Sequence, residues 1–120
     1  MYSVCVSTVF DAVHAVTVCG VDETPHNHEW MVDVIIEGEA LNDDGLLIDF
    51  IEIEKYLAEI IEPLLESNLN QNDVLNGDNP SAERVAFYFY DKLSKQIQGA
   101  VRLQSVTITE APNCKATYTP

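Results

Sequence analysis

The sequence is poor in basic residues. Six Lys and Arg stand against 20 Asp and Glu in 120 residues, which gives a formal net charge of −14 at pH 7. Proteins that bind nucleic acids irrespective of sequence neutralise phosphates with clusters of Lys and Arg, and no such cluster is present in this chain. This class of function is therefore excluded, and the acidity by itself indicates solubility and not a particular chemistry.

Long apolar runs and export signals are also missing. No stretch approaches the roughly 20 apolar residues that a membrane-spanning helix needs. The first residues, "MYSVCVSTVF", lack the basic start and cleavage site of a signal peptide. The three cysteines, Cys5, Cys19 and Cys114, are odd in number and widely spaced, which favours reduced thiols over a disulfide framework. We therefore expect a cytoplasmic protein without a membrane span.

Linkers and repeats are absent from the sequence pattern. Glycine and proline occur only five times each, and no segment is of low complexity. The composition, 47% apolar and 22% charged, is typical of a folded protein. We expect a single domain over residues 1–120, which is long enough to bury roughly two thirds of the surface that the unfolded chain exposes.

Two segments show the alternation of β-strands. In residues 2–10 the apolar side chains occupy mainly even positions, and the same parity extends to His14. In residues 30–36 the even positions are again apolar, and extending this strand backward places His26 and His28 on the inner face. Between the two strands, residues 15–25 contain Gly20 and Pro25 and are expected to form a loop.

The apolar period changes to three or four residues after Phe50, which predicts an amphipathic helix with Asp49 as its N-cap. Pro63 is expected to bend or end this helix. A second helix is predicted to begin with Asn79 as N-cap and Pro80 as first residue. Two further strands are predicted over 101–110 and 114–118. The order β-β-α-α-β-β predicts an α+β fold, an antiparallel four-stranded sheet with two helices on one face.

Three histidines are expected to meet at one end of this sheet. His26 and His28 lie on one strand face, with Cα atoms about 6.5 to 7 Å apart. If the first two strands form an antiparallel hairpin, His14 lies opposite them. Three neutral imidazoles with one open position are typical of a catalytic zinc site. The alternative is a polar strand end that happens to be rich in imidazole and binds no metal.

Several motifs together resemble a known family. The chain is similar to the 6-pyruvoyl-tetrahydropterin synthase and 6-carboxytetrahydropterin synthase family over nearly its whole length, in the same order. The motifs that carry the resemblance are "FDAVH", "HNHEW", "GLLIDF", "PLLESNL", "NPSAERVAFYFYDKL" and "VTITE".

The resemblance implies a fold, a metal and a substrate. The family fold is the tunnelling fold (T-fold), whose subunits assemble through sheet edges, which implies a homo-oligomer, a hexamer built as a dimer of trimers. It implies zinc on His14, His26 and His28, and a reduced pterin held by the carboxylate of Glu110. The implied activity is a zinc-dependent lyase acting on the side chain of 7,8-dihydroneopterin triphosphate or dihydroneopterin.

The catalytic residues depart from the family pattern. Cys19 is the only candidate for the family's general-base cysteine, but it lies seven residues before His26, further than is usual. Glu23, three residues before His26, resembles the subgroup in which a glutamate replaces or supplements that cysteine. A carboxylate near a metal-activated hydroxyl can serve as a base because burial raises its pKa.

A second departure affects proton transfer. Where the family has Asp-His-Lys-Asn-Leu, this chain has "LESNL", so Leu65, Glu66 and Ser67 replace the first three residues. Glu66 is the candidate for taking over proton transfer. Losing the lysine weakens the case for a triphosphate substrate. Asn27 replaces a family glycine inside the histidine motif without removing a ligand.

Three hypotheses follow from these residues. The first is an active zinc-dependent pterin lyase that uses Glu23 or Cys19, with Glu66, to move protons. The second is a catalytically silent homologue that keeps zinc and pterin binding. The third is an acidic oligomeric scaffold whose histidines bind nothing.

Overall fold

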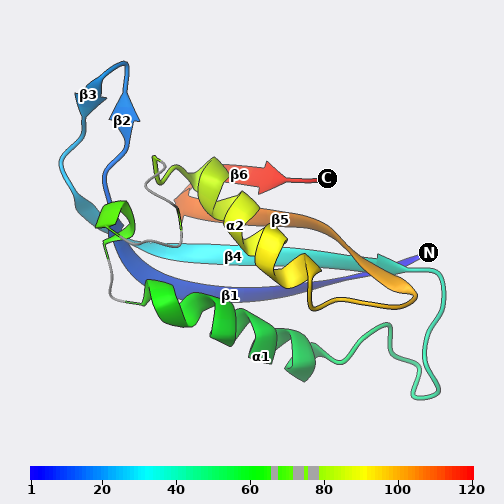
Figure 1. Ribbon diagram of the computed structural model, residues 1–120. Helices are drawn as coiled ribbons and strands as arrows, with labels where there is room; N and C mark the ends of the chain where they lie inside the picture. The colour runs from blue at the N-terminus through cyan, green and yellow to red at the C-terminus, as the bar shows by residue number, and fades with distance from the viewer. Residues whose placement is uncertain (66–67, 72–74, 76–78) are drawn as a thin grey trace.

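The fold is built on one long antiparallel sheet. The computed structural model describes residues 1–65, 68–71, 75 and 79–120. Its four-stranded sheet has the order β1-β4-β5-β6, with all neighbours antiparallel (Figure 1). The strands are β1 (Tyr2–His14), β4 (His26–Gly38), β5 (Val101–Ala111) and β6 (Cys114–Tyr118).

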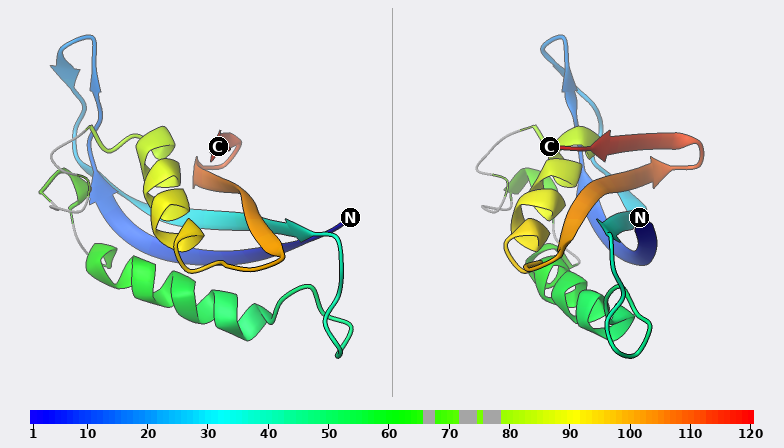
Figure 2. Two further views of the ribbon diagram at one scale, coloured as in Figure 1. Left: turned by 45° about the vertical axis from the view of Figure 1, so that its right-hand side comes forward. Right: turned by 90° about the vertical axis from the view of Figure 1, so that its right-hand side faces the viewer.

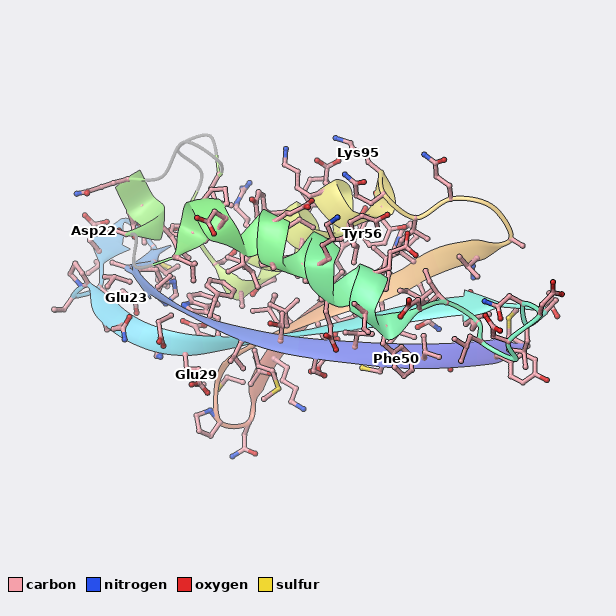
Figure 3. The ribbon with its side chains drawn as sticks, turned by 90° about the horizontal axis from the view of Figure 1, so that it is seen from below. Asp22, Glu23, Glu29, Phe50, Tyr56 and Lys95 are labelled. Carbon is pink, nitrogen blue, oxygen red and sulfur yellow. The ribbon has the colours of Figure 1, made fainter. Side chains whose placement is uncertain are left out.

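Both helices cover the same face of this sheet. Helix α1 (Phe50–Ile61) lies along β1, and α2 (Ala82–Ser94) lies over β5 and β6. Figures 2 and 3 show the two helices on one side of the curved strand layer, with the other side uncovered. The predicted α+β class is therefore confirmed. The predicted order β-β-α-α-β-β is also confirmed for the long strands and helices, and the additional elements are short turns and short strands.

The core lies between the sheet and the helices. Even positions of β1 and β4 point inward, as their alternation predicts, and odd positions are mostly exposed or half-buried. Burying a large apolar side chain stabilises a fold by about 1.5–3 kcal/mol, so this face fixes the register of the strands. The core side chains include Phe10, Trp30, Val32, Val34, Leu57, Phe89 and Leu93.

Helix α1 begins and ends where local chemistry requires. The Asp49 carboxylate accepts a hydrogen bond from the Ile51 N–H at 2.9 Å, which caps an otherwise unpaired helical donor. The α-helix ends at Ile61, and Pro63 lies in the short 3₁₀ turn η1 (Glu62–Leu64) that follows. A proline cannot donate the hydrogen bond that would continue the helix.

The predicted start of the second helix was wrong. The N-cap of α2 is Ser81, whose Oγ accepts a hydrogen bond from the Arg84 N–H at 3.2 Å. Asn79 instead donates and accepts hydrogen bonds with the backbone of Thr17. Asn79 and Pro80 therefore serve a loop contact that the local pattern could not reveal.

The segment predicted as a loop between the first strands contains a small hairpin. It is made of β2 (Thr17–Val18) and β3 (Val21–Asp22), which extend from the end of the main sheet where β1 finishes and β4 begins (Figure 1). Cys19 and Gly20 form its turn with φ values of 51° and 78°, the left-handed conformation that tight hairpin turns require. A second 3₁₀ turn, η2 (Leu69–Gln71), packs near the end of β1.

Among the described helices, none combines the length and the apolar character that crossing a membrane would require.

Candidate metal centre

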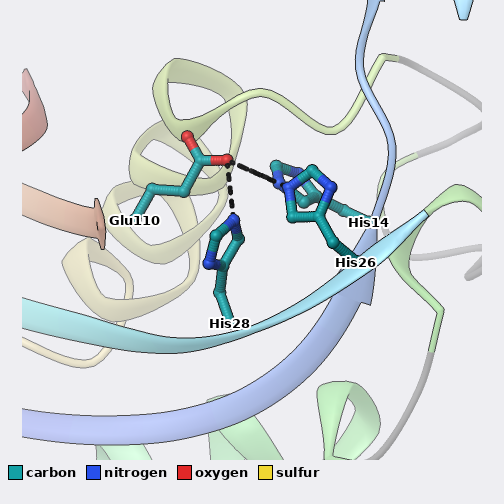
Figure 4. Close-up of side chains that lie close together, drawn as sticks. All are labelled: His14, His26, His28 and Glu110. Atoms are coloured by element: carbon teal, nitrogen blue, oxygen red, sulfur yellow. Dashed lines mark ion pairs between the residues drawn. The ribbon is translucent and has the colours of Figure 1, made fainter. Parts of the chain in front are cut away.

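The strand register brings the three histidines to one place. His14 is the last residue of β1 and pairs directly with His26, the first residue of β4, while Ala12 pairs with His28. All three side chains lie on the inward face, because successive side chains of a strand alternate between faces and the even positions of β1 and β4 point inward. The end of a two-stranded antiparallel ladder thus supplies three imidazoles from two adjacent strands (Figure 4).

The imidazole rings pack edge to face in a tight triangle. The ring centroids of His14 and His26 are 4.7 Å apart, those of His14 and His28 are 5.4 Å apart, and those of His26 and His28 are 4.4 Å apart. One ligand atom from each histidine and one from Glu110 all lie within 4.8 Å of one another. This group is therefore compact enough to hold one metal ion.

Backbone carbonyls orient two of the rings. His14 Nδ1 lies 2.9 Å from the carbonyl oxygen of Pro80, and His26 Nδ1 lies 2.9 Å from that of Thr24. A carbonyl can only accept, so each Nδ1 carries the proton and the Nε2 of the neutral ring keeps its lone pair. This arrangement of the outer nitrogen is typical of metal-binding histidines.

Glu110 reaches the same point from a third strand. It lies on β5 where the pairing with β6 shifts register between Thr109 and Ala111, and such bulges re-aim side chains near functional sites. Its Oε1 lies 2.5 Å from the Nε2 of His14, 3.6 Å from that of His28 and 4.0 Å from that of His26 (Figure 4).

The residues present fit a bound cation. His14 Nε2 is buried and makes no hydrogen bond to the described residues, although a carboxylate oxygen faces it at 2.5 Å. A lone pair facing an anionic oxygen is repulsive unless a positive charge lies between them. Imidazole nitrogens and a carboxylate oxygen are also the donors that zinc accepts in proteins.

Burial is graded across the cluster. The His14 side chain is fully buried, whereas those of His26, His28 and Glu110 are 34%, 26% and 24% exposed. One side of the cluster is therefore open to solvent and to a ligand. Burial lowers the pKa of His28 below its usual value, the charge of His26 lowers it further, and Glu110 acts in the opposite direction. His28 is thus kept in the neutral form that binds metals.

A tryptophan forms the floor of the cluster. Trp30 is fully buried, and its ring centroid lies 4.6 Å from that of His14 and 6.1 Å from that of His28. Its Nε1–H donates to the Ala12 carbonyl at 3.2 Å, and Phe10 stacks on it. The Trp30 ring therefore packs edge to face against the rings of His14 and His28.

Glu23 lies at the rim of the cluster. Its Oε1 is 3.8 Å from His26 Nε2 and accepts a hydrogen bond from the Val16 N–H at 2.8 Å. Its own N–H donates to the Val16 carbonyl at 3.1 Å. Glu23 therefore closes the base of the hairpin while its carboxylate remains beside the histidines.

Of the other two candidate catalytic residues, only Cys19 lies within the described part of the chain, and it does not join this group. Cys19 occupies the exposed turn of the β2–β3 hairpin, at the far end from the histidines. Glu66 lies outside the described residues, as does Ser67. Leu65, which replaces a family aspartate, is exposed directly after η1.

Two asparagines that the sequence pattern did not indicate as part of the site, Asn70 and Asn79, hold the chain beside His14. Asn70 accepts from the Ala15 N–H and donates to the Ala15 carbonyl, both at 2.7 Å. Asn79 does the same for Thr17, at 2.9 and 3.0 Å. These amides substitute for a neighbouring strand. Their asparagine-rich surroundings were visible in the sequence, but their partners were not.

The whole chain is similar to proteins of known families. The sequence profile of the family described as 6-pyruvoyl tetrahydropterin synthase matches residues 3–120. The dihydroneopterin monophosphate aldolase of Pyrococcus furiosus is 31% identical over 101 residues, covering 84% of this chain and 82% of that protein. The human 6-pyruvoyl tetrahydrobiopterin synthase is 32% identical over 95 residues, covering 78% of this chain and 65% of the human protein.

Solved structures show the same architecture. The 6-pyruvoyl tetrahydropterin synthase of Caenorhabditis elegans superimposes with a TM-score of 0.81 at 22% identity, covering 100% of this chain and 97% of that chain. The synthase of Plasmodium vivax gives a TM-score of 0.80 at 17% identity, covering 99% and 97%.

The sheet and its two helices define a T-fold protein, with a candidate metal centre at the end of the sheet. The chain belongs to the 6-pyruvoyl tetrahydropterin synthase family. The predicted fold and the predicted family are both confirmed.

Proposed function

We propose that this chain is a zinc-dependent lyase that acts on the side chain of a reduced pterin of the dihydroneopterin type. The observation that carries the proposal is the convergence of His14, His26 and His28, with the outer nitrogens of two of them bound to backbone carbonyls. Membership of a family whose named members are pterin synthases and a pterin aldolase supports the substrate class.

The three histidines would hold zinc through their Nε2 atoms. Bound zinc supplies Lewis acidity, which lowers the pKa of a coordinated hydroxyl. Pro80 and Thr24 keep the imidazoles of His14 and His26 in the required tautomer through their carbonyls. The partial exposure of His26 and His28 leaves room for the pterin side chain to approach.

Glu110 and Glu23 have different proposed roles. Glu110 accepts hydrogen bonds from the N–H edge of the pterin, since a partly buried carboxylate binds such a donor pair strongly. Glu23 takes a proton from a side-chain hydroxyl, because its carboxylate lies 3.8 Å from His26 at the open rim. In support, a Plasmodium vivax synthase has been solved with a catalytic glutamate replaced by alanine. Cys19 and Glu66 remain the alternative proton carriers of this proposal.

The reaction favoured by these groups is a retro-aldol cleavage. The base removes the proton of the 2′-hydroxyl, the C1′–C2′ bond breaks, and its electron pair passes into the conjugated C6=N5 bond of the dihydropterin. A proton returned to C1′ completes a hydroxymethyl-dihydropterin, and the remaining fragment leaves as an aldehyde. The aldolase relative from Pyrococcus furiosus supports this class of cleavage.

Few positive charges are available for a large anionic substrate. The whole chain has six Lys and Arg, and the position of the family lysine in "LESNL" is Ser67. A triphosphate requires several charge-assisted hydrogen bonds. We therefore propose dihydroneopterin or its monophosphate as the substrate in preference to the triphosphate.

The proposal includes a homo-oligomer of the T-fold type, a hexamer. The radius of gyration is 15.3 Å, whereas a compact chain of this length has about 13.6 Å. β1 and β6 are edge strands, and the uncovered sheet face carries the half-exposed side chains of Val9 and Met31. Association would cover these features. We propose the cytoplasm as the location, because all three cysteines are free and exposed.

A turnover assay tests the proposal directly. Protein purified without a His tag is analysed for zinc, then incubated with dihydroneopterin, its monophosphate and its triphosphate, and products are separated by chromatography. We expect about one zinc per chain and release of hydroxymethyl-dihydropterin. Zinc and tight pterin binding without any product would instead identify the silent homologue. Less than about a third of a zinc per chain would contradict both the active lyase and the silent homologue.

A matched pair of variants tests the base. Glu23→Gln should lower kcat by about 10²- to 10⁴-fold, the usual contribution of a general base. Glu29→Gln removes the same charge directly after His28, but Glu29 is exposed on the opposite face of the sheet (Figure 3). The activity of this variant should stay near wild type. Full activity of Glu23→Gln would remove this residue from the mechanism.

A further inference from the structure

The Glu110 carboxylate occupies the centre of the histidine cluster and not its edge. Its Oε1 faces the Nε2 atoms of His14, His28 and His26 at 2.5, 3.6 and 4.0 Å (Figure 4). These three contacts are the only polar side-chain contacts recorded for Glu110 within the described part of the chain. A carboxylate that only anchored a pterin would need no contact with all three imidazoles.

The separations match those of four ligands around one ion. Ligand atoms about 2.0–2.1 Å from a tetrahedral zinc lie about 3.3 Å from one another. The three distances from Glu110 Oε1 scatter around this value, and all four ligand atoms lie within 4.8 Å of one another. Small rotations of the side chains would complete three nitrogens and one oxygen around a cation.

We propose that Glu110 is the fourth protein ligand of the metal in the substrate-free enzyme, and that pterin binding displaces it. The inference rests on the proposed function for the identity of the metal and the ligand. A site with four protein ligands has no open position, so the carboxylate shields the metal until a pterin arrives. Once displaced, the same carboxylate is free to accept the N–H edge of the pterin. Glu110 thereby couples pterin binding to the release of one coordination position on the metal.

The other nearby carboxylate is not suited to this role. Glu23 Oε1 approaches only His26, at 3.8 Å, and already accepts the Val16 N–H. It lies on the hairpin side, whereas Glu110 enters from β5 across the cluster. Glu23 therefore serves as the internal comparison for a carboxylate beside the histidines that is not a ligand.

Metal affinity tests the proposal without any measurement of activity. Zinc dissociation constants are measured by competition with a chelator for the wild type, Glu110→Gln, Glu23→Gln and Glu29→Gln. Replacing a residue that only hydrogen-bonds to a metal ligand already lowers metal affinity 10- to 100-fold. We therefore expect Glu110→Gln, which replaces a ligand, to lower zinc affinity at least about 100-fold. Glu29→Gln should bind zinc as the wild type does, and Glu23→Gln should lose about tenfold or less.

Cobalt substitution provides a second readout, which reports the set of metal ligands and not the affinity. Co²⁺ replaces zinc in the wild type, and its visible absorption reports the ligand set. Adding neopterin, the oxidised pterin, should change the spectrum of the wild type, because the carboxylate leaves. The spectrum of Co²⁺-loaded Glu110→Gln without neopterin should already differ from that of the wild type.

The outcomes separate this inference from the proposed function. If Glu110→Gln binds zinc as tightly as the wild type and gives the same cobalt spectrum, Glu110 is not a ligand, and an enzyme that still cleaves pterin retains its proposed function. If the wild type binds no metal, the zinc-dependent function is overturned and this inference with it. If affinity falls at least 100-fold while neopterin leaves the wild-type cobalt spectrum unchanged, Glu110 is a permanent ligand and the displacement step is wrong.

Discussion

At the scale of single residues, the chemistry of the candidate centre depends on which nitrogen carries a proton. The carbonyls of Pro80 and Thr24 hold protons on the Nδ1 atoms of His14 and His26, so their Nε2 lone pairs point at Glu110. Burial keeps His28 neutral by lowering its pKa. The Nε2 atoms of all three imidazoles thus face the same carboxylate oxygen before any metal arrives.

The shift of His28 predicts how the metal-free protein responds to pH. Its pKa in the folded state lies below the usual value of 6.5, so the unfolded chain takes up this proton first as the pH falls. The contribution of His28 therefore lowers folding stability below about pH 6.5 and leaves it unaffected at higher pH. NMR titration of the metal-free protein should give a His28 pKa below 6.5.

Zinc binding should follow the same dependence, since a histidine must lose its proton to bind a metal. Affinity is expected to be nearly constant above neutral pH and to fall steeply under acidic conditions. The control is metal-free His28→Gln, in which the contribution of His28 to the pH dependence of folding stability should disappear. A His28 pKa at or above 6.5 would show that the carboxylates outweigh burial.

At the scale of secondary-structure elements, the start of α2 is set by a serine three residues before Arg84. The Oγ of Ser81 caps the Arg84 N–H, so Ser81→Ala should lower the free energy of unfolding by about 1 kcal/mol. Ser3→Ala, at an exposed position of β1, provides the matched control. Urea unfolding of the metal-free protein measures both, and equal stabilities would mean that Ser81 is not the effective cap.

Asn79 connects the beginning of α2 to the chain after β1. Its amide makes two hydrogen bonds to the backbone of Thr17, and both lie three residues from a candidate metal ligand. Asn79→Asp keeps the acceptor but loses the donor, and it places a carboxylate against the Thr17 carbonyl. We expect a loss of about 1–3 kcal/mol in unfolding free energy.

Asn79→Ala removes both bonds and should also weaken zinc binding, because the chain that presents His14 becomes less restrained. Zinc affinity and unfolding are measured on the same preparations. Gln98→Ala, at an exposed position before β5, is the control and should change neither. If Asn79→Ala loses stability but keeps full zinc affinity, the amide supports the fold and does not position the centre.

At the scale of the whole molecule, the metal and the fold should depend on each other. The candidate ligands come from β1, β4 and β5, so an ion at the cluster would link three strands of the sheet. At a free zinc concentration 100 times the dissociation constant, the folded state gains about 2.7 kcal/mol. For a chain of this length, the midpoint of thermal unfolding should rise by on the order of 10 °C.

Removal of zinc by a chelator, followed by its return, measures this shift by scanning calorimetry. Magnesium should not restore it, because that ion prefers oxygen ligands. An unchanged midpoint on removing a stoichiometric zinc would mean that the ion binds the unfolded chain equally well or lies elsewhere.

The charge of the molecule should affect assembly. Each chain carries −14, so subunits of the proposed hexamer repel one another at low ionic strength. Salt shortens the range of this repulsion, to about 10 Å at 0.1 M. Sedimentation should therefore show a larger oligomeric fraction at 0.5 M than at 0.02 M salt. A monomer under both conditions would contradict the proposed assembly.

The sequence alone determined the order of the long strands and helices and the face on which the histidines lie. Alternation with a period of two in β1 and β4 required the even positions to be buried, because a shift by one residue would expose the core. His14, His26 and His28 share that parity, so their common face followed from local pattern. The helix at Phe50–Ile61 and its Asp49 cap were equally local features.

Tertiary structure decided what the histidines meet. The position of Glu110 in the centre of the cluster depends on the register of β5 against β4, and the orienting carbonyl of Pro80 comes from 66 residues away. A long-range contact also explains why Asn79 is not the helix cap: its amide binds the backbone of Thr17 instead. Such contacts join segments that are distant along the chain. The apolar periodicity of one segment does not predict which residue of a distant segment it will contact.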